Sequence, residues 1–225
     1  MKNAVAVVLV LLAVGLAARR IAPALRGEPV PGLLGPERLD HPWPPVKGQP
    51  YPDLELPDAS GKPVKLSSLR GKVLLIEPIG LACAGCNAFA GGEELGGFRG
   101  ATVQEGVGSI EDLLRRYASV RLEDEPDLVL VQLLLFDDRS QVGHAPTAED
   151  ARAWARHFRL EGAPNVIVLR GSTALANPAS FGMVPGFQLV DRQGVLRYDG
   201  SGHHPQDPPY DTVLAAVPDL LREGQ

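Results

Sequence analysis

The chain has two cysteines, Cys83 and Cys86, which stand in the sequence Cys-Ala-Gly-Cys. Two thiols at this spacing can exchange a disulfide with another molecule, because one thiolate attacks and the second thiol resolves the mixed disulfide. An apolar run precedes the cysteine pair, and a helix is expected to begin at the pair. The free amides and the positive dipole end of a helix N-terminus lower the pKa of a thiol placed there. The spacing therefore predicts Cys83 as the nucleophile and Cys86 as the resolving cysteine.

Two other roles are open to the cysteine pair. A close pair outside the cytosol can be a structural disulfide, although a bond across two residues closes a very small loop and adds little stability. The pair can also bind a metal together with His203 and His204, which follow the last expected strand. Two thiolates with an imidazole suit Cu(I), and three or four such ligands suit zinc. As loop residues flanked by glycine and proline, these histidines are also consistent with a solvated position without function.

The segments around the cysteines predict strands that alternate with helices. An apolar strand is expected at 73–79, directly before the cysteine pair, and a second at 128–136. A helix is expected at 147–158, where Thr147 and Asp150 are typical of a helix start. Further strands are expected at 166–169, 186–191 and 195–198, further helices at 109–118 and 210–221, and a loop through Pro178. This order, with a hairpin near its end, predicts an α/β fold with a mixed sheet.

These segments resemble the thioredoxin superfamily, and more narrowly its membrane-anchored, cell-envelope members of the TlpA and ResA type. The resemblance covers about residues 50 to 222. It includes the entry Tyr-Pro-Asp-Leu-Glu-Leu at 51–56, the stretch at 64–72, the strand with Cys-Ala-Gly-Cys, and Val-Pro-Gly-Phe-Gln-Leu-Val-Asp-Arg-Gln-Gly at 184–194. It implies a thioredoxin-like fold, with a central mixed β-sheet flanked by helices. It also implies a redox-active Cys83–Cys86 disulfide and no further cofactor.

The resemblance assigns roles to three further positions. Pro185, preceded by Val184, matches the proline that in this family has a cis bond opposite the cysteines, where the adjoining backbone receives the substrate strand. Glu77, six residues before Cys83, matches a buried acid that relays a proton to the resolving cysteine. Burial should raise the pKa of this acid. The alternatives are an ordinary trans proline at 185 and a solvent-exposed strand-end acid at 77.

The chain departs from the family pattern in several places. Leu81-Ala82 stand where a tryptophan is usual, the dipeptide between the cysteines is Ala-Gly, and four glycines between 91 and 97 predict a short first helix. The connection at 98–127 is long and is a candidate partner surface. Sco-type copper proteins share this fold and an anchor, but three residues separate their two cysteines, whereas two residues separate Cys83 and Cys86. A peroxiredoxin is disfavoured because Gly80 stands where that family needs a hydroxyl. Trp43, Trp154 and His157 are expected to pack without a functional role.

The N-terminal segment has the features of a signal peptide or a membrane anchor. Lys2 precedes an apolar run at 4–18, which Arg19 and Arg20 close. These residues make about 22 Å of helix, short of the roughly 30 Å hydrocarbon core, and residues 21–25 can extend it. An uncleaved signal anchor is therefore expected at 1–26, with a proline-rich linker at 27–48 and the thioredoxin-like domain at 49–225. The flanking charges leave the orientation of the anchor open.

These observations predict a membrane-anchored thiol:disulfide oxidoreductase that reduces disulfides of envelope proteins. The soluble domain is expected outside the cytoplasm as a monomer, with a protein dithiol or disulfide as its partner. The reducing direction comes from the resemblance, and the residues leave an oxidase or isomerase open. The alternative is a Sco-like copper-binding protein. With a formal net charge of −5 and scattered basic residues, the chain lacks the basic surface of a nucleic-acid binder.

Overall fold

The computed structural model describes residues 42–139 and 143–223 of the chain. The predicted anchor at 1–26 and the first part of the predicted linker lie outside the described residues. Among the described helices, none combines the length and the apolar character that a membrane crossing requires. The anchor and the domain boundaries therefore stay predictions from the sequence.

A mixed five-stranded sheet forms the centre of the domain, in the order β5-β4-β3-β6-β7. Its strands are β3 (Val73–Gly80), β4 (Leu128–Phe136), β5 (Val166–Arg170), β6 (Gly186–Val190) and β7 (Leu196–Ser201). The first three are parallel, whereas β6 runs antiparallel to β3 and β7 antiparallel to β6. Consequently the ends of β3, β4 and β7 and the beginning of β6 share one edge of the sheet.

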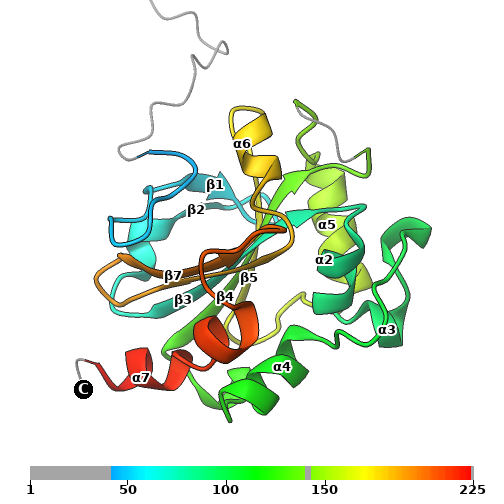
Figure 1. The fold of residues 1–225 in the computed structure, drawn as a ribbon. Helices are drawn as coiled ribbons and strands as arrows, with labels where there is room; N and C mark the ends of the chain where they lie inside the picture. Colours follow the sequence, from blue (N-terminus) through cyan, green and yellow to red (C-terminus); the bar gives the residue numbers. More distant parts are fainter. Residues whose placement is uncertain (1–41, 140–142, 224–225) are drawn as a thin grey trace, which may run out of the picture. The chain divides into compact units, whose positions relative to one another are not determined.

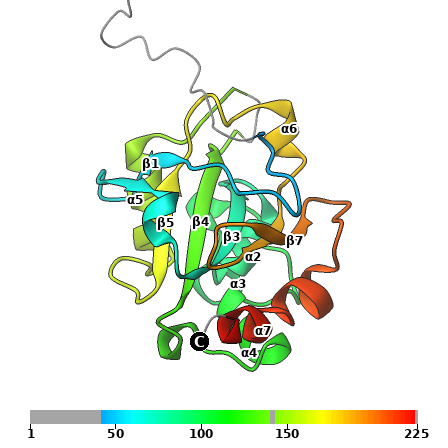
Figure 2. The same ribbon diagram turned by 90° about the vertical axis from the view of Figure 1, so that its left-hand side faces the viewer.

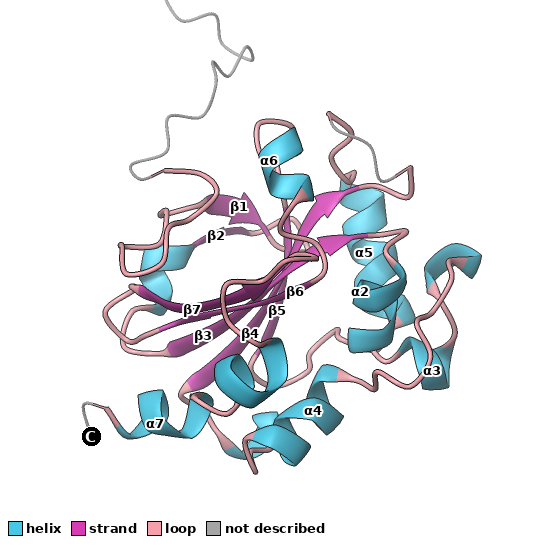
Figure 3. Ribbon diagram, in the orientation of Figure 1, coloured by secondary structure: helices cyan, strands magenta, loops and turns pink. Residues whose placement is uncertain are grey.

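The remaining elements surround this sheet. The α-helices are α2 (Ala84–Phe89), α3 (Gly92–Leu95), α4 (Ile110–Tyr117), α5 (Ala148–His157), α6 (Pro178–Phe181) and α7 (Val217–Arg222). A two-stranded hairpin is formed by β1 (Glu55–Pro57) and β2 (Pro63–Lys65). Short 3₁₀-helices are η1 (Leu66–Leu69), η2 (Phe98–Gly100) and η3 (Leu122–Asp124), and η4 (Pro209–Leu214) is a π-helix. Figure 3 shows how the helices and the hairpin enclose the strands.

The two faces of the sheet pack against different elements, because successive side chains of β3 point to opposite sides. Val73 and Leu75 pack with apolar residues of α4, η4 and α7. Leu74 and Ile76 pack with residues of β1 and its preceding segment and belong to a cluster that reaches α5. The hairpin and the α4–α7 pair lie on opposite sides of the sheet in Figure 1. In Figure 2, β1 lies in front of the sheet and α2 behind it. Because β3 and β4 are buried along their whole length, their apolar sequences are explained.

Most of the expected elements are present. Ser109 caps α4, and Thr147 caps α5 in a reciprocal hydrogen-bonding arrangement with Asp150. The expected loop through Pro178 is wrong in part, because α6 begins there: the side chain of Asn177 accepts a hydrogen bond from the Ser180 amide at 3.0 Å. The expected single helix at 210–221 is divided into η4 and α7, since proline at 218 fits only the first turn of a helix.

Residues 42–48, which the sequence assigns to the linker, contact the domain in the structure. The Trp43 indole N–H donates to Ser180 Oγ in α6 at 2.6 Å. The Lys47 ammonium lies 2.6 Å from the carboxylate of Asp207, and the Gly48 amide donates to Leu196 of β7. This segment thereby touches both connections that border the edge of the sheet where β3 ends, namely α6 and the loop after β7.

Candidate active site

The cysteine pair lies at the start of α2, immediately after β3. Cys83 is the N-cap residue, and its sulfur accepts a hydrogen bond from the Cys86 amide at 3.2 Å. The two sulfur atoms are 2.6 Å apart, and both cysteines are free. The helix ends after six residues, and Gly91 follows in a left-handed conformation with φ of 100°. The short first helix that the glycines predict is therefore present.

The two thiols differ in their environment. Cys83 is partly exposed, and hydrogen bonds from the Cys86 thiol and from the amides of Cys86 and Gly85 lower its pKa, against a smaller opposing effect of burial. Cys86 is fully buried, and burial together with the charges of Cys83 and Glu77 raises the pKa of its thiol well above the ordinary value. The thiolate is thus concentrated on the accessible sulfur, as nucleophilic attack by Cys83 requires.

Pro185 lies opposite α2, and the Val184–Pro185 peptide bond is cis. A Cβ atom placed on Gly85 would lie 3.0 Å from Cγ of Pro185 and 3.2 Å from Oε1 of Gln104. These distances are tighter than ordinary contacts between carbon and its neighbours, so a larger residue would push α2 away from the proline. The unusual Ala-Gly dipeptide therefore has a structural reason: the glycine permits the close approach of α2 and Pro185.

A cavity of about 280 Å³ opens between α2, α6 and the start of β6. Its lining includes Cys83, the Val184–Pro185 pair and apolar rings from β4 and α6: Gly80, Ala82, Cys83, Ala84, Gly85, Gln104, Phe136, Phe181, Val184, Pro185 and His203. The Phe181 side chain is 46% exposed although it is large and apolar. The cavity thus offers an apolar surface directly beside the reactive sulfur.

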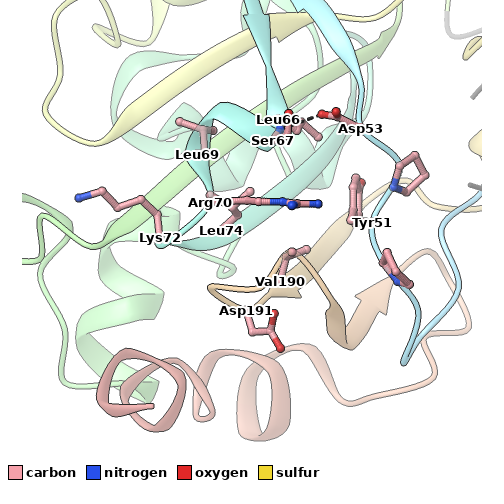
Figure 4. A pocket seen from close by; sticks show the side chains of 13 residues that line it. Tyr51, Asp53, Leu66, Ser67, Leu69, Arg70, Lys72, Leu74, Val190 and Asp191 are labelled. Atoms are coloured by element: carbon pink, nitrogen blue, oxygen red, sulfur yellow. Dashed lines mark hydrogen bonds between the residues drawn. The ribbon is translucent and has the colours of Figure 1, made fainter. Parts of the chain in front are cut away.

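A second cavity, at the opposite edge of the sheet, is much smaller. It has a volume of about 40 Å³ and lies between Tyr51, η1 and the end of β6. Figure 4 shows Arg70 directed toward Tyr51 across this space, with Lys72 pointing away. A volume of this size holds one or two water molecules and no substrate side chain. Of these two cavities, only the one beside the cysteines is large enough for a substrate side chain.

The two candidate histidine ligands are placed differently. His203 lines the cavity of Cys83, as the return of the chain through β7 leads one to expect, whereas His204 is absent from that lining. Both side chains are exposed. Thiols and imidazole are suitable donors for copper, but within 42–139 and 143–223 no three His, Cys, Asp or Glu side chains are gathered as metal ligands. In the described structure His203 therefore shares a cavity with Cys83 without a third such side chain gathered beside them.

Glu77 is fully buried in β3, and its charge acts on the thiol of Cys86. Its Oε2 atom accepts a hydrogen bond from Nε2 of Gln132 at 3.1 Å, while Oε1 has no hydrogen-bond partner in the described structure. Burial raises the pKa of this carboxyl well above its ordinary value, Gln132 opposes the shift, and the charge of Cys83 adds to it. The alternative of a solvated strand-end acid is wrong.

Two further residues of the site, Gln132 and Gln104, were not predicted from the sequence. Gln132 lies next to Glu77 in β4, and the indole N–H of Trp154 in α5 donates to Oε1 of Gln132 at 2.8 Å. One polar residue inside the apolar run Leu-Val-Leu-Val-Gln-Leu-Leu-Leu-Phe was the available signal. Gln104 comes from the long connection at 98–127, and its backbone N–H donates to the backbone carbonyl oxygen of Ala84 in α2 at 3.1 Å. No sequence signal indicated that this connection returns to the cysteines.

Comparisons with known proteins resolve the fold. No family model matches the chain, and no curated protein matches its sequence. A solved structure of a candidate protein disulfide isomerase from Bacteroides thetaiotaomicron is similar, with a TM-score of 0.50 and 18% identity over 80% of this chain and 92% of that one. The chain has a thioredoxin-like fold.

Two further structures resemble this thioredoxin-like chain. A candidate electron transfer protein from Aquifex aeolicus VF5 has a TM-score of 0.50 and 12% identity, with 79% of this chain and 93% of that one covered. BsSco, a member of the Sco family of cytochrome c oxidase assembly proteins, has a TM-score of 0.47 and 17% identity, with 83% and 99% covered. At these identities the likeness concerns the fold. The narrower resemblance to TlpA and ResA stays a prediction.

Proposed function

We propose that this chain is a thiol:disulfide oxidoreductase in which Cys83 attacks and Cys86 resolves. The observation that carries the proposal is the contrast between the two thiols. Cys83 lines a cavity, and hydrogen bonds to its sulfur lower the pKa of its thiol. Burial instead raises the pKa of the Cys86 thiol. An inert structural pair has no need of one accessible thiolate and one protected thiol.

The reaction follows from these positions. The Cys83 thiolate attacks a substrate disulfide, forms a mixed disulfide and releases the first substrate sulfur as a thiolate. The Cys86 thiol then gives its proton to Glu77 and attacks the Cys83 sulfur. The Cys83–Cys86 bond forms, the bond to the substrate breaks, and the electron pair leaves on the second substrate sulfur. The substrate is reduced by two electrons, and the cysteine pair is oxidised. The reverse sequence oxidises a dithiol.

The apolar cavity supports a polypeptide as the substrate. An extended segment can pair with the backbone at Val184, next to Pro185, and place its disulfide at Cys83. An apolar side chain of that segment fits beside Phe181, whose exposure in the free protein is otherwise costly. Gln104 at the rim offers an amide for hydrogen bonds to the peptide backbone.

The location and direction of the activity rest on sequence. The apolar run at 4–18 with its flanking basic residues supports a membrane anchor, and the proline-rich linker would hold the domain away from the bilayer. A partner protein in the cell envelope, with disulfides that this domain reduces, is the assignment we propose. The monomeric state is part of this proposal.

Trapping of the mixed disulfide tests the proposed function. Reduced wild type should reduce insulin disulfides and turn over when dithiothreitol is supplied. With dithiothreitol removed, the reduced Cys86→Ser variant should accumulate a mixed disulfide between Cys83 and the insulin chain, visible by mass spectrometry, and the Cys83→Ser variant should form none. The proposal is overturned if wild type leaves insulin unreduced, or if Cys86→Ser turns over at the wild-type rate.

A second candidate function, copper binding, is favoured by one observation: His203 and Cys83 line the same cavity. A rearranged loop would be needed to gather Cys83, Cys86 and His203 around one ion. Titration of the reduced protein with Cu(I) separates the two functions, with His203→Ala as the test and His204→Ala as its control. Tight binding that His203→Ala removes and His204→Ala retains would favour copper handling. Weak binding that both variants share would disfavour it.

A further inference from the structure

A chain of buried hydrogen bonds leads from α5 to the carboxyl group of Glu77. The Trp154 indole donates to Oε1 of Gln132 at 2.8 Å, and Nε2 of Gln132 donates to Oε2 of Glu77 at 3.1 Å. All three side chains have 0% exposure. Their hydrogen-bonding atoms are therefore withdrawn from water, and the partner of each atom determines its role.

The indole fixes the orientation of the amide. An indole nitrogen only donates, so the Gln132 atom beside it must be the carbonyl oxygen. The amide NH₂ group then has to face Glu77, and an NH₂ group only donates. Oε2 of Glu77 consequently accepts a hydrogen bond in either protonation state. A carbonyl oxygen accepts a hydrogen bond better than a carboxylic hydroxyl oxygen does, so the donor at Oε2 favours the proton of the neutral carboxyl on Oε1, the oxygen without a hydrogen-bond partner in the described structure.

We propose that Gln132 and Trp154 are positioning residues that direct the exchangeable proton of Glu77 to Oε1 and favour its release. This inference rests on the proposed function, because it concerns the proton that Cys86 loses in the resolving step. The charge of Glu77 acts on the Cys86 thiol, and Cys86 packs against the strand residue after Glu77, with 3.9 Å between its sulfur and the carbonyl oxygen of Pro78.

The same donor keeps Glu77 able to accept the proton. A buried carboxylate with no donor is strongly disfavoured, and a hydrogen bond from a neutral NH₂ group to the charged form offsets part of this cost. The ionisable groups that act on Glu77 and Cys86 are the two thiols of α2 and Glu77 itself, while β4 and α5 present the neutral Gln132 and Trp154. Loss of either neutral residue should therefore shift the pH dependence of the resolving step to higher pH.

Two variants remove the device at different points. Trp154→Phe keeps an aromatic ring but removes the N–H, so that the Gln132 amide can turn its oxygen toward Glu77 and favour the protonated acid. Gln132→Leu removes the donor to Glu77 directly. Each variant has a matched control in this chain. Trp43→Phe removes an indole hydrogen bond to Ser180, and Gln188→Leu removes a fully buried glutamine from β6.

The resolving step can be measured with 5,5′-dithiobis(2-nitrobenzoate) and the reduced full-length protein. Attack by Cys83 releases one coloured 2-nitro-5-thiobenzoate and leaves the second on Cys83. Attack by Cys86 then releases that second ion, and its rate reports the resolving step alone. In Trp154→Phe and Gln132→Leu this second rate should fall about tenfold at pH 7 and recover at higher pH, since a hydrogen bond to a charged group is worth about one factor of ten or more. The first rate should stay within about twofold.

The outcomes separate this inference from the proposed function. If wild type never releases the second ion, the exchange mechanism fails. If wild type releases it and Trp154→Phe and Gln132→Leu have the wild-type pH profile, the mechanism stands and the positioning role is overturned. An equal shift in Trp43→Phe and Gln188→Leu would also overturn it, because the effect would then come from general loss of packing. If a test variant fails to fold, the carboxyl ¹³C shift of Glu77 in the other variant gives the same answer, with an upward pKa expected.

Discussion

Two fully buried glutamines flank β3, and their surroundings differ in one respect. Gln188 in β6 accepts a hydrogen bond from the Tyr51 hydroxyl at 2.9 Å and lies 3.3 Å from Asp199, which also binds Ser201. Gln132 in β4 joins Trp154 to Glu77, where one carboxyl oxygen has no hydrogen-bond partner among the described residues. Among the described residues no buried side-chain atom of the Gln188 network lacks a partner, so we call this network complete, and we call the Gln132 network open because it ends at Oε1 of Glu77.

The difference between the two networks indicates which one contributes to the proposed reaction. A buried polar group without a partner costs about 1–3 kcal/mol, so a protein that is selected for stability alone would complete both networks. The complete network ties the segment at residue 51 to β6 and β7 and serves the fold. The open network ends at Glu77, an ionisable group whose pKa is raised and whose charge acts on the Cys86 thiol. Its Oε1 atom, which no described side chain occupies, is available for the proton that Cys86 loses in the proposed resolving step.

Loss of the ionisable group in the open network should have the largest effect. Glu77→Gln keeps the shape of the side chain but cannot accept a proton, so disulfide reduction at pH 7 should fall about hundredfold or more. The matched change in the complete network, Asp199→Asn, should leave the rate within about twofold. Steady-state reduction of insulin measures both. Equal losses in the two variants would erase the functional contrast between the networks.

Loss of the complete network should affect stability and not the reaction. Gln188→Leu leaves the buried Tyr51 hydroxyl without an acceptor and takes a donor from Asp199, so the free energy of unfolding should fall by about 3 kcal/mol. The rate of insulin reduction by the folded protein should stay within about twofold. Urea unfolding provides the measurement, and a loss below about 1 kcal/mol would contradict the structural role of this network.

The open network should make stability depend on pH. Burial raises the pKa of Glu77 in the folded state, so the folded protein binds this proton more tightly than the unfolded chain does. Its contribution is complete below the ordinary carboxyl pKa and is lost as the pH rises toward the folded pKa. Glu77→Gln should therefore be about 2 kcal/mol more stable than wild type at pH 8 and gain far less at pH 4. A difference that is equal at both pH values would contradict this linkage.

The smallest expected effect concerns the outer end of the complete network. Tyr51→Phe removes the hydroxyl and leaves Oε1 of Gln188 without its donor, which should cost about 1 kcal/mol of unfolding free energy. Activity should not change. Thermal unfolding of the variant beside wild type checks this, and a reduction in activity greater than about threefold would show that the complete network also serves the reaction.

The parts of the fold that local sequence determines were predictable. The strands at β3 and β4, the capped starts of α4 and α5, and the cysteine pair at a helix start follow from apolar runs, capping residues and glycines near one another in the chain. The burial of Glu77 was predicted only from the resemblance to the thioredoxin superfamily, and that resemblance did not predict the hydrogen bonds of Glu77. Trp154 reaches Gln132 across 22 residues.

Contacts of this kind depend on how α5 packs over β4, and no local pattern records that packing. The same holds for Gln104, which the connection at 98–127 returns to α2, and for the pairing of Trp43 with Ser180. The helix α6 is a different case, because Asn177 and Pro178 are typical of a helix start and the signal was present. The anchor at 1–26, the partner and the location stay predictions.

The contrast between the two thiols is tested most directly by the rate at which each reacts with iodoacetamide. The reduced protein is alkylated for short times over a range of pH, and mass spectrometry of the peptides gives one rate for Cys83 and one for Cys86. Because hydrogen bonds lower the pKa of Cys83 and burial raises that of Cys86, Cys83 should react at a pH below the range of an ordinary thiol while Cys86 stays unmodified. Equal rates for the two cysteines, or faster reaction of Cys86, would contradict the account.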